Sequence, residues 1–281
     1  MLGSPVGHSL SPVLHRAAYA ALGLAGWRYD RVECDEAALP ALVGGLGPEW
    51  VGLSLTMPLK RKALELADEI SPLAAEVGAA NTLLLGGAPS GGRRAENTDV
   101  AGLLAALREA GLRRVGRSVL LGAGGTAQAA LAALRELGDP SPRVLVRDAG
   151  RAGGLLAAAD RLGVRPVVSG GLPYTPLPDA DLVISTLPAG AADAVAVQAG
   201  GWTSGTVVLD AVYSPWPTRF AAAVADAGCQ VVGGLAVLLH QAVAQVELMT
   251  GRPAPIGAMR AALEAAASVD IDVNIDACRS R

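Results

Sequence analysis

The stretch Ser118-Val119-Leu120-Leu121-Gly122-Ala123-Gly124-Gly125-Thr126-Ala127 decides how this chain folds. Its first four residues are typical of a short buried strand, and Gln128–Leu137 has a strong helical pattern. Between them, Gly122–Ala127 has the spacing G-x-G-x-x-A, whose glycines permit a tight turn and a close approach of backbone to a pyrophosphate. The helix N-terminus near Thr126 offers free N–H groups to phosphates. With a strand before and a helix after, Gly122–Ala127 predicts a dinucleotide site; a tight turn without a ligand is the alternative.

The same alternation of strands and helices continues on both sides of this stretch. Strands are predicted at Arg143–Val146, Leu182–Ser185 and Val207–Asp210, and a helix at Leu103–Ala110 that Gly111 ends. Such alternation predicts an α/β fold with a parallel, doubly wound sheet of the Rossmann type.

A chain of 281 residues is long enough for two domains or for one large α/β domain, and we expect two. Residues 103–233 form the Rossmann-type domain in this prediction, and residues 1–102 with 234–265 form an N-terminal α/β domain. In the latter, a strand is predicted at Val51–Leu55 and a helix start over Pro58–Ala67. Residues 266–281 are predicted to be a loose tail, because Ser268–Arg281 has no helical period.

Composition excludes several classes of protein. A net charge of −3 without a basic cluster argues against nucleic acid as a partner. Cys34, Cys229 and Cys278 are far apart and lack the spacing of metal ligands, so we expect free thiols in a reducing compartment and no bound metal. There is no apolar run of membrane-spanning length and no signal peptide pattern, so we expect a soluble, cytoplasmic protein that does not contact membranes.

The residues after the second strand of the Rossmann-type domain indicate which dinucleotide binds. An acidic residue there would bind a ribose 2′-OH, whereas arginine would accept a 2′-phosphate. Arg147 and Arg151 both favour a phosphate, and hence NADP over NAD. Asp148 lies between them, where it would repel the phosphate, cap the next helix or pair with Arg151. Alternatively, Arg147 and Arg151 are ordinary surface residues that do not bind the cofactor.

Lysine is almost absent from this chain. The only two, Lys60 and Lys62, lie in Leu55-Thr56-Met57-Pro58-Leu59-Lys60-Arg61-Lys62, and every other basic side chain except histidine is arginine. Arginine stays protonated, but lysine loses its proton at an accessible pH and acts as a general acid or base. Alternatively, Lys60 and Lys62 only contribute surface charge that keeps the protein in solution.

Other polar residues lie where elements of the first domain are expected to begin or end. Ser9 and Ser11 both lie just before Pro12, and Ser11 is directly next to it. Asn81 follows Gly78-Ala79-Ala80, and Asp99 follows Asn97-Thr98. Each has a simple structural interpretation on its own, as a helix cap or a turn residue.

Taken together, these segments resemble the shikimate dehydrogenase family, and the resemblance covers most of the chain. The opening segment Gly3–His15 resembles the family's substrate motif, and Gly52–Lys60 resembles its lysine segment. Further motifs follow in family order: Gly78–Leu83, Asn97–Asp99, Gly122–Ala127, Asp210–Pro215 and Gly234–Gln241.

The resemblance implies a reversible, NADP-dependent reduction of 3-dehydroshikimate to shikimate, in aromatic amino acid biosynthesis. It makes Lys60 and Asp99 the catalytic pair and places Ala211 and Gly234 at the cofactor. The substrate's carboxylate and hydroxyls would be bound by Ser9, Ser11, Thr56, Asn81, Tyr213 and Gln241. These residue types suit a polyhydroxylated ring, which needs many neutral donors and acceptors. Lys60 would supply a proton and a positive charge beside the oxygen that gains charge during hydride transfer. A monomer or a homodimer is expected.

The chain departs from the family pattern at its start and near its end. Only Met1 and Leu2 precede Gly3, where the family has a short strand, so we expect added upstream residues to raise stability. Val237 stands where the family often has Met near the nicotinamide. An NAD-dependent quinate/shikimate dehydrogenase and a non-catalytic dinucleotide or metabolite sensor remain as alternatives, although a sensor has no need of Lys60 and Asp99.

Overall fold

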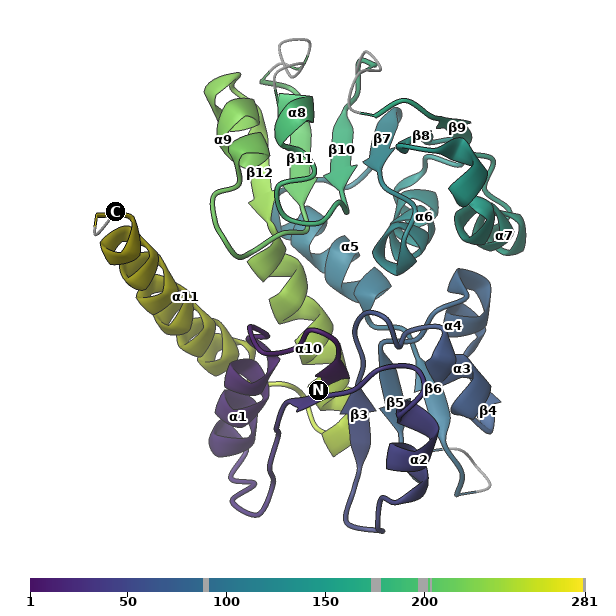
Figure 1. Ribbon diagram of the computed structural model, residues 1–281, viewed down its shortest axis with the longest axis vertical. Coiled ribbons are helices and arrows are strands. Elements are labelled where there is room, and N and C mark those ends of the chain that lie inside the picture. The colour runs from purple at the N-terminus through teal and green to yellow at the C-terminus, as the bar shows by residue number, and fades with distance from the viewer. Residues whose placement is uncertain (88–90, 173–177, 197–201, 203, 280–281) are drawn as a thin grey trace. The chain divides into compact units, whose positions relative to one another are not determined.

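A computed structural model of the chain describes residues 1–87, 91–172, 178–196, 202 and 204–279 (Figure 1). The chain forms two compact units. Unit 1 comprises Met1–Ala75, Ala79–Thr98 and Leu238–Arg281, and unit 2 comprises Glu76–Gly78 and Asp99–Val237. Among the described residues, no helix is both long enough and apolar enough to cross a membrane.

Unit 2 is built on a six-stranded parallel sheet with the order β12-β11-β10-β7-β8-β9 (Figure 1). The strands are β7 (Ser118–Leu121), β8 (Arg143–Leu145), β9 (Val167–Ser169), β10 (Leu182–Ser185), β11 (Val207–Asp210) and β12 (Gln230–Gly233). The predicted parallel, doubly wound sheet is therefore confirmed, and β7, β10 and β11 have the predicted bounds. Val119, Val183 and Val208 are at most 1% exposed, because helices cover both faces of a parallel sheet.

The helices of unit 2 form two groups. The α-helices are α5 (Asp99–Glu109), α6 (Gly125–Leu137), α7 (Gly153–Leu162), α8 (Asp193–Ala196) and α9 (Arg219–Asp226). Helix α6 packs between α5 and α7, while α8 packs against α9. Gly111 follows α5 with a φ of +89°, which confirms the predicted glycine stop.

Unit 1 combines a four-stranded mixed sheet with a shorter parallel pair. The sheet has the order β3-β5-β6-β4, and β1 pairs in parallel with β2. An isolated parallel bridge between Leu2 and Leu55 ties β1 to the end of β3. The strands are β1 (Leu2–Gly3), β2 (Val32–Glu33), β3 (Gly52–Ser54), β4 (Glu69–Ile70), β5 (Thr82–Leu84) and β6 (Arg94–Glu96).

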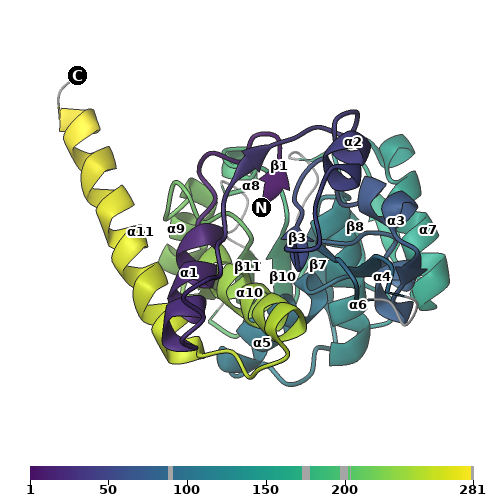
Figure 2. The same ribbon diagram turned by 90° about the horizontal axis from the view of Figure 1, so that it is seen from below.

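Helices from both ends of the chain complete the structure. They are α1 (Ser11–Ala21), α2 (Leu39–Gly44), α3 (Lys62–Leu66), α4 (Pro72–Val77), α10 (Gly234–Thr250) and α11 (Ile256–Arg279). Helices α1 and α11 lie side by side (Figure 2). Helix α10 begins in unit 2 and continues in unit 1. The core of unit 1 includes Leu39, Leu59 and Leu83, which are fully buried.

Two predictions about local structure are wrong. The helix expected to start at Pro58 begins only at Lys62, because Leu59 donates its N–H to the Thr56 carbonyl at 2.7 Å and closes a turn first. The tail expected to lack a helix is helical through Arg279, as the last part of α11. Extending a helix that Ile256 has already started costs far less than nucleating a new one, so a weak pattern suffices. Residues 280–281 lie outside the described part of the chain.

Candidate functional site

The two serines near the chain start are held at the beginning of α1. Ser11 is the first residue of α1 and is 2% exposed, and its N–H donates to Ser9 Oγ at 3.3 Å. Ser9 is partly exposed. Leu10 is the N-cap of α1 and no side chain caps the helix, so this contact is a local turn between residues two positions apart. It holds the hydroxyl of Ser9 next to the backbone of Ser11.

Thr56 and Lys60 follow β3 and lie beside neighbouring segments of unit 1. The Thr56 N–H donates to the Leu2 carbonyl at 2.9 Å, and the Lys60 carbonyl accepts from Ala80 N–H at 2.8 Å. A Cβ on Gly3 would lie 2.3 Å from Thr56 Cγ2, so only glycine permits this approach of β1. The structure thus brings the start of the chain, the lysine segment and the segment before Asn81 together.

Asn81 lies at the centre of a buried polar network. Its side chain is 2% exposed. Asn81 Oδ1 accepts from Thr98 N–H at 2.8 Å and from Thr82 Oγ1 at 3.1 Å, and Asn81 Nδ2 donates to Gln241 Oε1 at 3.3 Å. Asn81 and Gln241, both predicted from the sequence as substrate residues, therefore touch although they are 160 positions apart.

Sequence reasoning missed part of this network. Ser54, Thr82, Thr98 and Gln245 are all buried and hydrogen-bonded to it. Gln245 follows Gln241 by four positions on α10, which places both amides on one face of the helix. That spacing is the one sequence signal that would have pointed to Gln245.

In unit 2, the predicted fingerprint Gly122–Ala127 spans the end of β7 and the start of α6. Gly122 has a φ of +108°, and a Cβ there would lie 2.6 Å from Thr186 Oγ1, so glycine is required. Gly124 is the N-cap of α6 and has an extended backbone, which leaves the first N–H groups of the helix at this loop. The loop lies between β7 and β10, where the strand order reverses. Ligands of open α/β sheets bind at such a point.

The residues predicted to select the cofactor follow β8. Arg147 and Arg151 are both exposed. Asp148 caps the 3-10 turn Ala149–Arg151, because its Oδ1 accepts from Gly150 N–H at 2.9 Å. Of the three interpretations of Asp148, namely repelling the phosphate, capping or pairing with Arg151, the structure supports capping.

Ala211 and Gly234 touch at the carboxyl ends of β11 and β12. A Cβ on Gly234 would lie 2.2 Å from the Ala211 carbonyl oxygen, so any larger residue would force the two segments apart. Tyr213 follows in the same loop and is partly buried, which raises the pKa of its phenol. Asp99 is the first residue of α5 and is 8% exposed. Lys60 belongs to unit 1 and Asp99 to unit 2.

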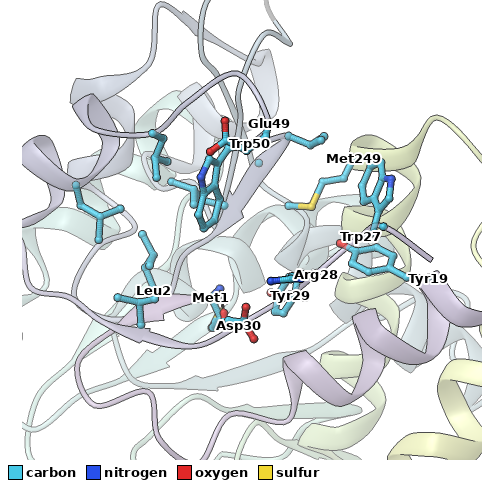
Figure 3. Close-up of a pocket in the computed structure, with 17 residues that line it drawn as sticks. Met1, Leu2, Tyr19, Trp27, Arg28, Tyr29, Asp30, Glu49, Trp50 and Met249 are labelled. Atoms are coloured by element: carbon cyan, nitrogen blue, oxygen red, sulfur yellow. Dashed lines mark hydrogen bonds between the residues drawn. The ribbon is translucent and has the colours of Figure 1, made fainter. Parts of the chain in front are cut away.

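Unit 1 also contains a pocket of about 770 Å³ that none of the predicted site residues lines (Figure 3). Its walls include Tyr29, Trp50, Gly52 and Met249, and Met1 lies at its edge. The α-amino group of Met1 donates to the Asp30 carbonyl at 2.7 Å, and burial lowers the pKa of this amine to about 5. Met1 and Leu2 line this pocket together with residues 26–30, which precede β2.

Joining four alternating apolar and polar residues in front of Met1 is expected to raise the melting temperature. An amide at Met1 keeps the bond to Asp30 without a charged group to desolvate, and the added side chains bury apolar surface in the pocket. A gain of about 2 kcal/mol corresponds to a shift of roughly 5 °C for a chain of this size. Thermal unfolding measures it, with an equally long Gly-Ser extension as the control. Equal melting temperatures for the two extended chains would contradict the expectation.

Two family models match this chain. The model described as "Shikimate dehydrogenase substrate binding domain" matches residues 1–83, and the one described as "Shikimate 5'-dehydrogenase C-terminal domain" matches residues 234–264. Among curated proteins, the shikimate dehydrogenase (NADP(+)) of Halorubrum lacusprofundi is 38% identical over 274 residues, which cover 94% of this chain and 97% of the relative.

Solved structures give the same relationship. The crystal structure of Mycobacterium tuberculosis shikimate dehydrogenase is 47% identical, with a TM-score of 0.82 over 94% of this chain and 97% of the other. Shikimate 5-dehydrogenase from Thermus thermophilus, solved in complex with NADP(H) and shikimate, is 33% identical with a TM-score of 0.80 and the same coverage of both chains.

Proposed function

This chain belongs to the shikimate dehydrogenase family, and we propose on that premise that it catalyses the reversible, NADP-dependent reduction of 3-dehydroshikimate to shikimate. One observation supports the proposal most directly. The buried network around Asn81 holds two amide side chains, those of Asn81 and Gln241, in one orientation beside the segment that carries Lys60. A preorganised set of neutral donors and acceptors is what recognition of several ring hydroxyls requires.

The proposed chemistry is a hydride transfer coupled to a proton transfer. NADP, when bound, would accept the hydride from the hydroxyl-bearing carbon of shikimate. Lys60 would take the hydroxyl proton in this direction and return it to the ketone oxygen in the other. Asp99 would orient Lys60 and accept a hydrogen bond from a substrate hydroxyl. Ser9, Ser11, Thr56 and Tyr213 would bind the carboxylate and the remaining hydroxyls.

The cofactor would bind unit 2, with its pyrophosphate at Gly122–Ala127 and the start of α6. The close contact of Ala211 with Gly234 would shape the nicotinamide end of the site. Arg147 and Arg151 would bind the 2′-phosphate from the exposed loop after β8, since the Asp148 carboxylate is engaged in capping that loop.

Replacing Arg147 by Ala is expected to raise the KM for NADP by about tenfold to a hundredfold, because a charge-assisted hydrogen bond to the phosphate is lost. The KM for NAD, which lacks that phosphate, should change little. Initial rates at varied cofactor concentration measure both constants. Arg143→Ala is the matched control, since Arg143 is also exposed but lies at the opposite end of β8. An equal rise in both KM values would remove Arg147 from 2′-phosphate recognition.

The decisive experiment follows the reduced nicotinamide while shikimate and quinate are each offered NADP and NAD. A strong preference for shikimate with NADP is the expected result. Turnover mainly of quinate or with NAD would contradict the substrate or the cofactor that we propose. A folded chain that binds NADPH but shows no turnover with any combination of substrate and cofactor would support the sensor alternative.

We propose further that the protein works in the cytoplasm as a monomer or a homodimer. Cys34 is buried and its thiol is free, which agrees with a reducing compartment, and Cys229 is buried as well. Cys278 lies where the side chains are outside the described part of the structure.

A further inference from the structure

Gln245 makes three hydrogen bonds and thereby joins α10 to both β3 and β5. The side chain is 1% exposed. Its Oε1 accepts from Ser54 Oγ at 2.8 Å, and its Nε2 donates to the Asn81 carbonyl at 3.1 Å and to Thr82 Oγ1 at 2.8 Å. A backbone carbonyl can only accept, so the nitrogen of this amide must face Asn81. The orientation of Gln245 is therefore fixed by its partners.

This orientation is passed on to the side chain of Asn81. Because Thr82 Oγ1 accepts from Gln245, its own hydrogen is directed to Asn81 Oδ1, at 3.1 Å. Thr98 N–H donates to the same oxygen at 2.8 Å. With Oδ1 held in this way, Asn81 Nδ2 donates to Thr98 Oγ1 at 2.8 Å and to Gln241 Oε1 at 3.3 Å. The order of contacts is thus Gln245, Thr82, Asn81 and Gln241.

We propose that Gln245 is a positioning residue for substrate binding: through Thr82 it fixes which way the Asn81 amide faces, and so positions Gln241, which Asn81 Nδ2 contacts, for shikimate. The inference rests on the proposed function. Without the Gln245 donor, the Thr82 hydroxyl is free to rotate and donate to another acceptor. The Asn81 amide then loses one of the donors that hold its oxygen, and part of the population turns its oxygen toward Gln241.

A purely structural role would have a different signature. The bond from Ser54 to Gln245 fastens β3 to α10 but does not reach the Asn81 side chain, so its loss should affect stability alone. The bond from Gln245 to Thr82 does reach Asn81, so its loss should also affect substrate affinity. Neither change should alter the KM for NADP.

The test compares the shikimate KM, the NADP KM, kcat and the melting temperature of Gln245→Leu, Thr82→Val and Ser54→Ala. We expect about a tenfold rise in shikimate KM for Gln245→Leu and for Thr82→Val, with kcat and the NADP KM within about twofold of wild type. In the double variant the two effects should be clearly less than additive, because both changes break the same connection. Ser54→Ala should lower the melting temperature while the shikimate KM stays unchanged. If Gln245→Leu does not fold, Thr82→Val, which keeps the side-chain shape, tests the connection by itself.

The possible failures are distinguishable. Wild-type turnover of shikimate combined with an unchanged shikimate KM in folded Thr82→Val and Gln245→Leu would overturn the positioning role alone. Equal rises in the KM values for shikimate and NADP would overturn it too. A wild-type chain without shikimate turnover would refute the proposed function, and the positioning role with it.

Discussion

Replacing Lys60 by Met is expected to lower kcat about a thousandfold, the scale of a lost general acid–base group. Methionine keeps an unbranched side chain of similar length but has no proton to give or take. The ketone oxygen would then gain negative charge during hydride transfer without a proton donor beside it. The KM for shikimate should change only modestly, because Ser9, Ser11, Asn81 and Gln241 remain. Initial rates with shikimate and NADP measure the loss.

Lys62→Met is the matched control for this change. Lys62 is the only other lysine of the chain, two positions away, and it pairs with Glu65 on the same helix turn. An ion pair of this kind contributes little, so kcat should remain close to wild type. A Lys60→Met protein with near-normal kcat would exclude Lys60 from proton transfer, whereas equal losses in both variants would indicate a general effect of charge in this segment.

The second large effect concerns pH and the buried side chain of His15. The ring is 0% exposed and stacks on Tyr29 with a centroid distance of 3.9 Å. Its Nδ1 lies 2.9 Å from the Ser11 carbonyl, which can only accept, so Nδ1 carries the hydrogen in the neutral ring. Burial lowers the pKa of His15 from 6.5 to about 4. The folded chain thus binds this proton only at a much lower pH than the unfolded chain does.

The free energy of unfolding should therefore decrease as the pH falls from about 6.5 toward 4. Above that window, His15 is neutral in both states and destabilises neither. Within it, the unfolded state takes up the proton and is favoured, by about 3 kcal/mol at the lower end. Urea unfolding at a series of pH values measures the decrease.

Two histidine variants isolate this contribution. His15→Phe keeps an aromatic ring against Tyr29 but cannot titrate, so its stability should fall less steeply with acid. His8→Gln changes an exposed histidine and should follow the wild type. The Met1 amine, whose pKa is also lowered by burial, is present in all three chains, and its positive charge is the smallest of the causes that shift the pKa of His15. Parallel curves for wild type and His15→Phe would show that His15 does not carry the effect.

The sequence predicted the sheet of unit 2 where a strand has a buried run of three apolar residues. β7, β10 and β11 are buried at every position, so their apolar runs are distinct from the helices around them. β9 was missed because it is a short edge strand of three residues, and Val167 is 56% exposed. β12 was missed because its apolar pair Val231-Val232 is bounded by Gln230 and Gly233, which gives too short a run.

The site was predictable where one segment supplies a whole motif. The fingerprint Gly122–Ala127 owes its glycine requirement to local geometry, as the φ of Gly122 shows. The network around Asn81 was not predictable in this way, because its hydrogen bonds join distant segments. Ser54 and Gln245, for example, are 191 positions apart. Residue type alone does not distinguish Gln245, which orients its neighbours, from any other glutamine in a helix.

The scarcity of lysine has a practical consequence for anyone who labels or captures this protein. Amine-reactive esters, aldehyde cross-linkers and amine-coupled sensor surfaces act mainly on lysine side chains, and the chain offers only Lys60 and Lys62. Apart from the α-amino group of Met1, which is largely buried, such reagents will therefore modify the one segment that the reaction is expected to use. A chip loaded in this way would hold the protein by the lysine segment. Substrate that protects Lys60 from such a reagent would conversely give a simple footprint of occupancy, read as the mass added at Lys60 compared with Lys62.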